Sequence, residues 1–176
     1  MRNRLTAAGL SVSLLACVHA GLAQERLTRQ DYLKVFSSAD ASGTSAVIDG
    51  MPYCEIWSNG FAPGEEHLLG YVFLRSVQVE GKQLHLLVGI NENGAISKVA
   101  ARDPEMVEDE FLAQFDGRTV NSSFECARTL EDLRFVPAML KAMRGKQGAS
   151  DLIAEEIQST MISAQTLLKA GSVMAN

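Results

Sequence analysis

The sequence predicts an α+β fold in which an antiparallel sheet, a meander of about three to five strands, packs against helices. Three apolar stretches rich in β-branched and aromatic residues follow one another with short turns between them, at residues 68–79, 84–90 and 95–101. Stretches whose apolar residues recur with the helical period flank this meander. The chain has 176 residues, 47% of them apolar, and a formal charge of −5, which suits one globular domain.

The N-terminus has the three zones of a secretory signal peptide at residues 1–23: a basic start, an apolar stretch, and small residues ending at Ala23. We therefore expect export to the periplasm and a single mature domain over residues 24–176, which is not an integral membrane protein after cleavage. Two alternatives stay open. The segment could remain as a membrane anchor, or the chain could be a lipoprotein attached at Cys17, because the residues before Cys17 resemble a lipobox.

Several functional classes are disfavoured. An acidic chain without a basic cluster cannot neutralise a phosphate backbone, so we expect no nucleic-acid binding. His67 and His85 lie on different segments without a neighbouring cysteine pair, so we expect no metal site. No catalytic motif is present, and we expect a protein that is not an autonomous enzyme.

The elements before the meander are short. Thr28 is a candidate N-cap for a short helix with one apolar side. Residues 37–50 are small and polar and predict a loop, residues 53–57 a strand, and residues 59–66 a second loop. In the meander, Asn-Glu-Asn-Gly at residues 91–94 is a strong hairpin signal.

Helices are predicted after the meander. Pro104 opens one that ends before Gly117, and residues 130–144 form a second with a kink at Pro137. Residues 145–148 predict a break before a last helix. That helix is capped by Asp151, and its core candidates are Leu152, Ile153, Ile157, Met161, Leu167 and Leu168.

Two cysteines remain after residue 23, Cys54 and Cys126. An exported chain with two cysteines suggests one disulfide between them. The alternative is two separate buried thiols, since the sequence does not give their separation.

Four segments occur in a recognisable order: residues 70–73 (GYVF), 87–99 (LVGINENGAISKV), 110–118 (EFLAQFDGR) and 157–164 (IQSTMISA). This order resembles the FMN-binding domain family of exported electron-transfer proteins. Its best-known members are the peripheral flavin subunits of the ion-translocating Rnf and Nqr respiratory complexes. The resemblance covers about residues 70–170 and implies an FMN-binding-domain-like fold.

The resemblance also implies a flavin site. In the family a threonine of the terminal motif carries FMN as a phosphoester, and small neighbours let backbone N–H groups reach the phosphate at a helix start. Here the acceptor position falls on Met161, which has no hydroxyl, so we expect any FMN to be bound without a covalent link. The candidate cofactor-binding residues are Thr160, Ser159, Ser163 and Tyr71.

Each candidate also has a purely structural interpretation. The hydroxyls could bond to carbonyls one helical turn back, and Tyr71 could pack in the core. Three functions therefore remain. One is electron transfer at the bacterial envelope beside a membrane-associated redox complex. Another is a cofactor-free interaction module on the same scaffold, which binds another envelope protein. The third is a small-ligand carrier that uses the flavin cleft without a covalent link.

Overall fold

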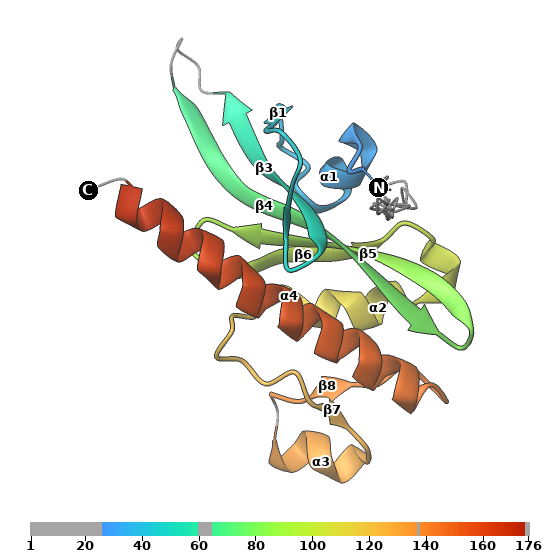
Figure 1. Cartoon of the computed structure of the whole chain (residues 1–176). Coiled ribbons are helices and arrows are strands. Elements are labelled where there is room, and N and C mark those ends of the chain that lie inside the picture. The colour runs from blue at the N-terminus through green and yellow to red at the C-terminus, as the bar shows by residue number, and fades with distance from the viewer. Residues whose placement is uncertain (1–25, 60–64, 137, 175–176) are drawn as a thin grey trace, which may run out of the picture.

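A single antiparallel sheet with helices on both faces forms the body of the protein (Figure 1). The computed structural model describes residues 26–59, 65–136 and 138–174. The predicted α+β class and the antiparallel sheet are confirmed. The signal-peptide prediction and residues 60–64 of the second predicted loop lie outside the described residues.

Within the described residues the sheet has six strands. They are β1 (Ala41–Ser42), β2 (Ala46–Ile48), β3 (Met51–Asn59), β4 (Glu66–Val79), β5 (Lys82–Asn91) and β6 (Ile96–Ala101). The order across the sheet is β1-β3-β4-β5-β6, and β2 also pairs with β3. The hairpin at residues 91–94 is confirmed, with Gly94 at a φ of 77° as this turn requires.

The prediction of a simple loop over residues 37–50 is wrong, because this segment contains β1 and β2. Both strands are antiparallel partners of the same outer edge of β3. Strands of two and three residues give little signal in the sequence, and their pairing comes from the edge of β3 that they cover.

The short first helix, α1 (Arg29–Val35), begins where the sequence predicts. Thr28 and Asp31 form a capping box in which each side chain accepts a hydrogen bond from the other residue's backbone N–H. Tyr32, Val35 and Phe36 pack on one face of the sheet. Their buried neighbours there are Cys54, Ile56, Val72, Leu74 and Leu87.

A two-pronged ion pair joins α1 to the end of β6. Asp31 is 5% exposed, and its carboxylate accepts hydrogen bonds from Arg102 Nε at 3.0 Å and Nη2 at 2.8 Å. Burial acts to raise the pKa of Asp31, but the hydrogen bonds from Arg102 and Thr28 outweigh it and hold the pKa below its usual value. The ionised form of Asp31 therefore stabilises the fold.

This ion pair predicts a pH dependence. A carboxyl whose pKa is lowered on folding stabilises the protein above its unfolded pKa, roughly 4, and loses that contribution as the pH falls through its folded pKa. We expect Asp31→Asn to lower the unfolding free energy by about 2 kcal/mol at pH 7 and by much less near pH 3. Urea unfolding from pH 7 to 3 measures the gap, with Glu92→Gln as the exposed control. A gap that stays constant would contradict the assignment.

The opposite face of the sheet is covered by the longest helix, α4 (Gln147–Met174), which crosses it in Figure 1. The main apolar core lies between them. Ile153, Ile157 and Met161 meet Phe73, Leu86 and other sheet residues there. Two expectations are wrong: α4 begins before Asp151, and Leu152 is 47% exposed. No helix in the described part of the chain combines the length and apolarity needed to cross a bilayer.

The helix predicted from Pro104 is broken into three short pieces: η1 (Pro104–Met106), α2 (Asp109–Leu112) and η2 (Ala113–Phe115). The break lies at Val107, whose backbone is extended and whose side chain is 5% exposed. Burying Val107 turns the chain between η1 and α2, and a continuous helix would not allow that turn.

The helix predicted over residues 130–144 is also wrong. Only α3 (Leu130–Phe135) forms, and it connects two short parallel strands, β7 (Cys126–Ala127) and β8 (Leu140–Lys141). The residue before a proline disfavours the helical conformation, and Val136 ends the helix with φ −129° and ψ 78°. Pro137 itself lies outside the described residues. The β7–α3–β8 unit lies beside α4, away from the main sheet (Figure 1).

Candidate functional site

The predicted flavin-attachment segment lies in the middle of α4 and not at a helix start. Backbone N–H groups there are used within the helix, so this segment does not offer the free N–H groups of a helix start that the family's phosphate site uses. Thr160 is 0% exposed, and its hydroxyl donates to the carbonyl of Glu156 at 2.8 Å. Met51 Sδ lies 3.6 Å from the same hydroxyl. Thr160 therefore faces the sheet, bonded one helical turn back.

The neighbouring residues of this segment are also part of the packing of α4 against the rest of the protein. Ser163 is buried, and its Oγ donates to Asp49 Oδ2 at 2.6 Å, which ties α4 to the turn between β2 and β3. Ser159 is half-buried on the same helix. Met161, at the position of the family's acceptor, is 1% exposed in the core. The described contacts of this segment are those of a helix that packs against a sheet.

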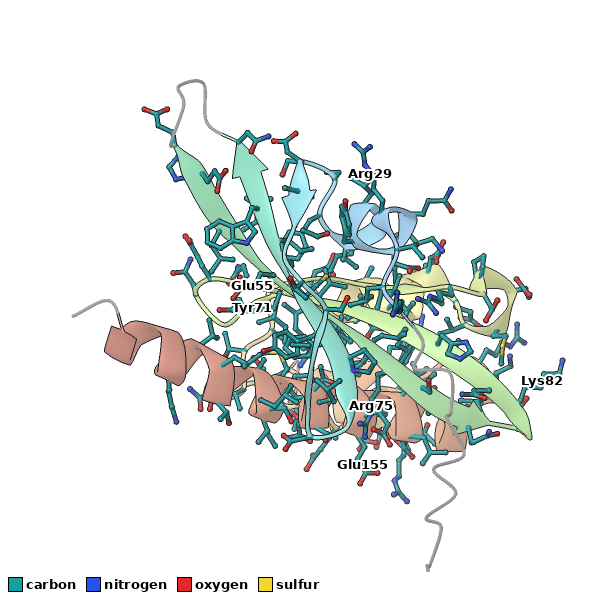
Figure 2. The ribbon with its side chains drawn as sticks, turned by 45° about the horizontal axis from the view of Figure 1, so that its top comes forward. Arg29, Glu55, Tyr71, Arg75, Lys82 and Glu155 are labelled. Carbon is teal, nitrogen blue, oxygen red and sulfur yellow. The ribbon has the colours of Figure 1, made fainter. Side chains whose placement is uncertain are left out.

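Tyr71 belongs to an aromatic cluster. Its ring centroid lies 6.3 Å from that of Tyr53 and 6.5 Å from that of Phe73, and Tyr53 stacks on Phe73 at 5.6 Å. Figure 2 shows Tyr71 beside Glu55 of the paired strand. Burial, followed by the charge of Glu55 and the influence of Tyr53, raises the pKa of Tyr71. These contacts match the core-packing interpretation of Tyr71.

The predicted disulfide between Cys54 and Cys126 is wrong, and the alternative of two buried thiols holds. Cys54 lies in the α1-side cluster and Cys126 in the α4-side core, so the sheet separates them. Burial, with nearby acidic groups, raises the pKa of Cys54 to about 11 and that of Cys126 to about 12. Thiols with such pKa values are poor nucleophiles at neutral pH.

The segment at residues 110–118 has a role that the sequence did not reveal. Phe111, Leu112 and Phe115 are core residues, while Gln114 and Arg118 hold the β7–α3–β8 unit. The Gln114 carboxamide accepts from the backbone N–H of Lys141 at 2.7 Å and donates to its carbonyl at 3.0 Å. The Gln114 side chain thereby pairs with both the backbone N–H and the carbonyl of Lys141 in β8.

Arg118 binds three backbone carbonyls from separate parts of the chain. Nε donates to Gln114 at 2.8 Å, and Nη1 donates to Ala138 at 2.9 Å and to Ser123. Burial lowers the pKa of Arg118, yet a guanidinium stays protonated at neutral pH. The side chain therefore clamps the segment after η2 to the segment before β8.

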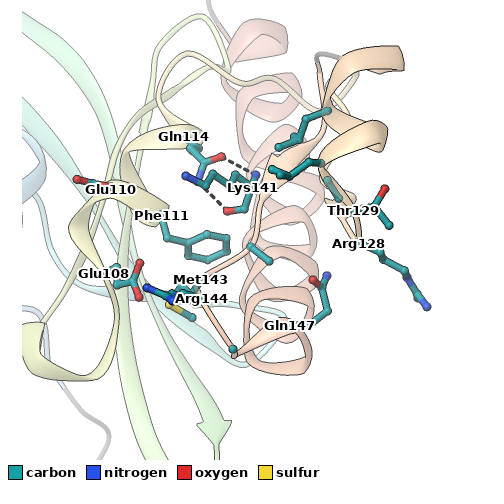
Figure 3. A pocket seen from close by; sticks show the side chains of 15 residues that line it. Glu108, Glu110, Phe111, Gln114, Arg128, Thr129, Lys141, Met143, Arg144 and Gln147 are labelled. Atoms are coloured by element: carbon teal, nitrogen blue, oxygen red, sulfur yellow. Dashed lines mark hydrogen bonds between the residues drawn. The ribbon is translucent and has the colours of Figure 1, made fainter.

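A groove of about 590 Å³ lies between α2 and the β7–α3–β8 unit, and we call it the α2–α3 groove (Figure 3). Leu133 contributes half-buried apolar surface to it, while Phe111 and Met143 lie almost fully buried in its floor. Leu130, at its mouth, is 77% exposed. Charged side chains complete the lining, namely Glu108, Glu110, Arg128, Lys141 and Arg144. A concave apolar surface with a charged rim is typical of a binding site.

The α2–α3 groove contains none of the four predicted cofactor-binding residues. Sequence reasoning singled out the segment of Phe111 and Gln114 but assigned it no role. The residues of α3 and β8 carried no signal, because residues 130–144 were predicted to form one helix, and β7 at Cys126–Ala127 was not predicted at all. In the described residues no cluster of three or more metal-ligating side chains occurs.

Comparisons with known proteins do not assign this chain to a family. No protein-family model matches the chain. No curated protein matches it in sequence. Fold and surface therefore define the class as an α+β domain with an open groove beside a small βαβ unit.

Proposed function

We propose that this protein is an accessory module of the bacterial envelope that binds a partner protein through the α2–α3 groove and carries no covalent flavin. The observation that carries the proposal is the separation of two features. The hydroxyl that resembles a flavin acceptor, that of Thr160, is fully buried, whereas the open groove lies elsewhere. The FMN-binding-domain-like resemblance remains the reason for proposing an exported protein of the respiratory envelope.

Exposed apolar surface supports a protein partner. Leu130 is 77% exposed and Val136 47%, both on or next to α3. Burying a side chain such as Leu130 at an interface contributes roughly 1.5–3 kcal/mol. Charged residues around it, such as Glu108 and Arg144, provide a polar rim that sets specificity.

A second candidate is non-covalent FMN in the same groove, followed by electron transfer to a membrane redox complex. The α2–α3 groove has a volume of about 590 Å³, which suits a small-molecule cofactor. Lys141 and Arg144 in its lining would be the cationic groups for a phosphate. Against it, Phe111 is only 2% exposed and offers little ring surface for stacking. We therefore place the accessory role first.

A flavin assay tests the proposal. The chain is produced with its leader in a bacterial host that contains the flavin transferase, then denatured and separated by size. We expect no flavin fluorescence on the chain, and no difference between the natural protein and Thr160→Val or Ser163→Ala. Fluorescence that stays with the denatured chain and is lost in Thr160→Val would overturn the proposal. Fluorescence released on denaturation would favour the second candidate.

Partner binding is tested with a photoreactive amino acid in place of Leu130, using Lys82 at the distant β4–β5 turn as the control position. We expect a specific protein adduct from position 130 and none from position 82. An adduct that maps to one segment of one envelope protein supports the proposal. Equal labelling at both positions, or none at position 130, contradicts it.

A further inference from the structure

The polar contacts described between α1 and the sheet meet at one place, the end of β6. The Asp31 carboxylate accepts two hydrogen bonds from the Arg102 guanidinium. Lys34 Nζ donates to the carbonyls of Ala101 at 3.2 Å and Arg102 at 3.3 Å. Arg102 Nη2 also donates to the carbonyl of Arg26, before the helix, at 2.9 Å. These contacts hold a helix of seven residues at the end of a single strand.

After α1 the chain is fixed to the sheet again at Asp40. The backbone N–H of Asp40 donates to the carbonyl of Trp57 at 3.0 Å, and its carboxylate accepts from the N–H of Asn59 at 2.9 Å. Between α1 and Asp40, the exposed residues Ser37 and Ser38 form a turn. This turn is a hinge between the helix and the fixed point at Asp40.

The apolar residues beneath α1 form a cluster of their own. α1 and α4 lie on opposite faces of the sheet (Figure 1). Within the described residues, the core on the α4 side contains no residue of α1. On the α1 side, Cys54 of β3 is 2% exposed beneath the helix. Removing α1 would therefore expose one face of the sheet and leave the packing of α4 in place.

α1 approaches β5 closely at Gly89. A Cβ at this position would lie 3.0 Å from the Cβ of Val35 and 3.1 Å from Cε2 of Phe36. Ordinary contacts between carbon atoms are about 3.5–4.0 Å long. The missing side chain of Gly89 lets the helix close on the sheet, and a larger residue would push it away.

We propose that α1 is a lid that opens as one unit while the sheet and α4 stay folded. The Asp31–Arg102 pair is its latch, and residues 37–39 are its hinge. Opening exposes the apolar sheet face around Ile56, Val72 and Leu87, which the closed lid buries. The lid thereby decides whether this face is accessible. The proposal goes beyond partner binding in the α2–α3 groove, because no residue of α1 lines that groove.

The separate cluster and the local attachment make this opening less costly than global unfolding. Proteins open in cooperative units, and a unit with few tertiary contacts opens more often than the core does. A helix of seven residues is not stable without a surface to pack on, so the lid unwinds as it opens. It re-forms when Tyr32, Val35 and Phe36 return to the sheet.

The test uses Cys54 as the reporter of opening, because α1 covers its thiol. The full chain is treated with N-ethylmaleimide in the absence of denaturant, and peptide mass spectrometry follows the modification of Cys54 with time. Urea unfolding gives the fraction of globally unfolded chain. We expect Cys54 to be modified at least tenfold faster than that fraction allows. Low urea concentrations should change this rate little, because lid opening exposes little surface.

Variants of the lid contacts should change the rate of modification. Gly89→Ala adds a Cβ against Val35 and Phe36, and Asp31→Asn weakens the latch. Each should speed the modification of Cys54 about tenfold or more. Gly148→Ala is the matched control, since a Cβ there would meet nothing within 4 Å, and it should leave the rate unchanged.

Ile157→Val distinguishes lid opening from unfolding of the whole domain. Ile157 is fully buried in the core on the α4 side, and its truncation should raise the globally unfolded fraction about fivefold. The rate at Cys54 should not change, because this core is intact with the lid open or closed. A rate that rises with the unfolded fraction in Ile157→Val would overturn the proposal. So would a rate in the natural chain no faster than global unfolding allows, or one that Gly89→Ala leaves unchanged.

Discussion

Replacing Gly70 with alanine should lower the unfolding free energy by about 4 kcal/mol or more. Gly70 is buried in β4 at a φ of 146°, a region that glycine enters and other residues avoid. A Cβ at this position would lie 2.1 Å from the carbonyl oxygen of Ile90 and 2.7 Å from the Cα of Asn91. Both contacts are with backbone of the paired strand, so relief would require β4 and β5 to separate.

Gly81→Ala is the matched control for this experiment. Gly81 also has a positive φ, of 79°, but a Cβ there would meet nothing within 4 Å. Its replacement carries only the penalty of a left-handed backbone, about 1–2 kcal/mol. Urea unfolding of both variants separates the steric clash from the backbone conformation. If Gly70→Ala were no less stable than Gly81→Ala, the close approach of the two strands would be refuted.

Gly70 also explains part of the resemblance to the flavin proteins. The Gly-Tyr pair at residues 70 and 71 marks the site where two strands approach closely and an aromatic ring enters the core. These roles need no cofactor. The Gly-Tyr pair by itself therefore does not indicate a flavin site, which is consistent with the proposed accessory function.

Replacing Arg118 with alanine should lower the unfolding free energy by about 3 kcal/mol. Its guanidinium bonds to the carbonyls of Gln114, Ser123 and Ala138. Without it, three carbonyls lose a charged donor, and the β7–α3–β8 unit keeps only the Gln114 pair as its side-chain attachment to η2 among the bonds described above. Amide exchange should rise throughout residues 119–144 and change little in β4 and β5.

Two further variants serve as controls for this experiment, Arg118→Lys and Arg128→Ala. Lysine keeps the charge but cannot span three acceptors with a planar fork, so it should rescue only part of the loss. Arg128 is exposed, and its removal should change the stability by about 0.5 kcal/mol or less. Unchanged exchange over residues 119–144 in Arg118→Ala would show that the unit is held by other contacts.

Local signals in the sequence predicted the centre of the fold well. The capping box at Thr28 and Asp31 and the hairpin at residues 91–94 are each decided within a few residues. The three strands of the meander repeat apolar residues with enough regularity to be recognised. Such features depend on short-range hydrogen bonds and on which side chains leave water, so the chain alone specifies them.

The errors concern segments whose conformation depends on distant partners. The apolar spacing of residues 130–144 suits a helix, but Leu140 pairs with Cys126 in a parallel ladder that no local pattern announces. Val107 breaks a predicted helix because the core accepts its side chain. A disulfide inferred from the presence of two cysteines does not form, because Cys54 and Cys126 lie on opposite faces of the sheet.

The sequence by itself determined an α+β scaffold with an antiparallel meander, and it marked the segments at Gly70 and Phe111 as special. The tertiary structure decided what those segments do. It buried the Thr160 hydroxyl against β3, made Gln114 and Arg118 bind the backbone of the β7–α3–β8 region, and left the α2–α3 groove open. The physical reason is that burial and edge exposure belong to the packed assembly of elements, because each depends on what lies across from a residue in space.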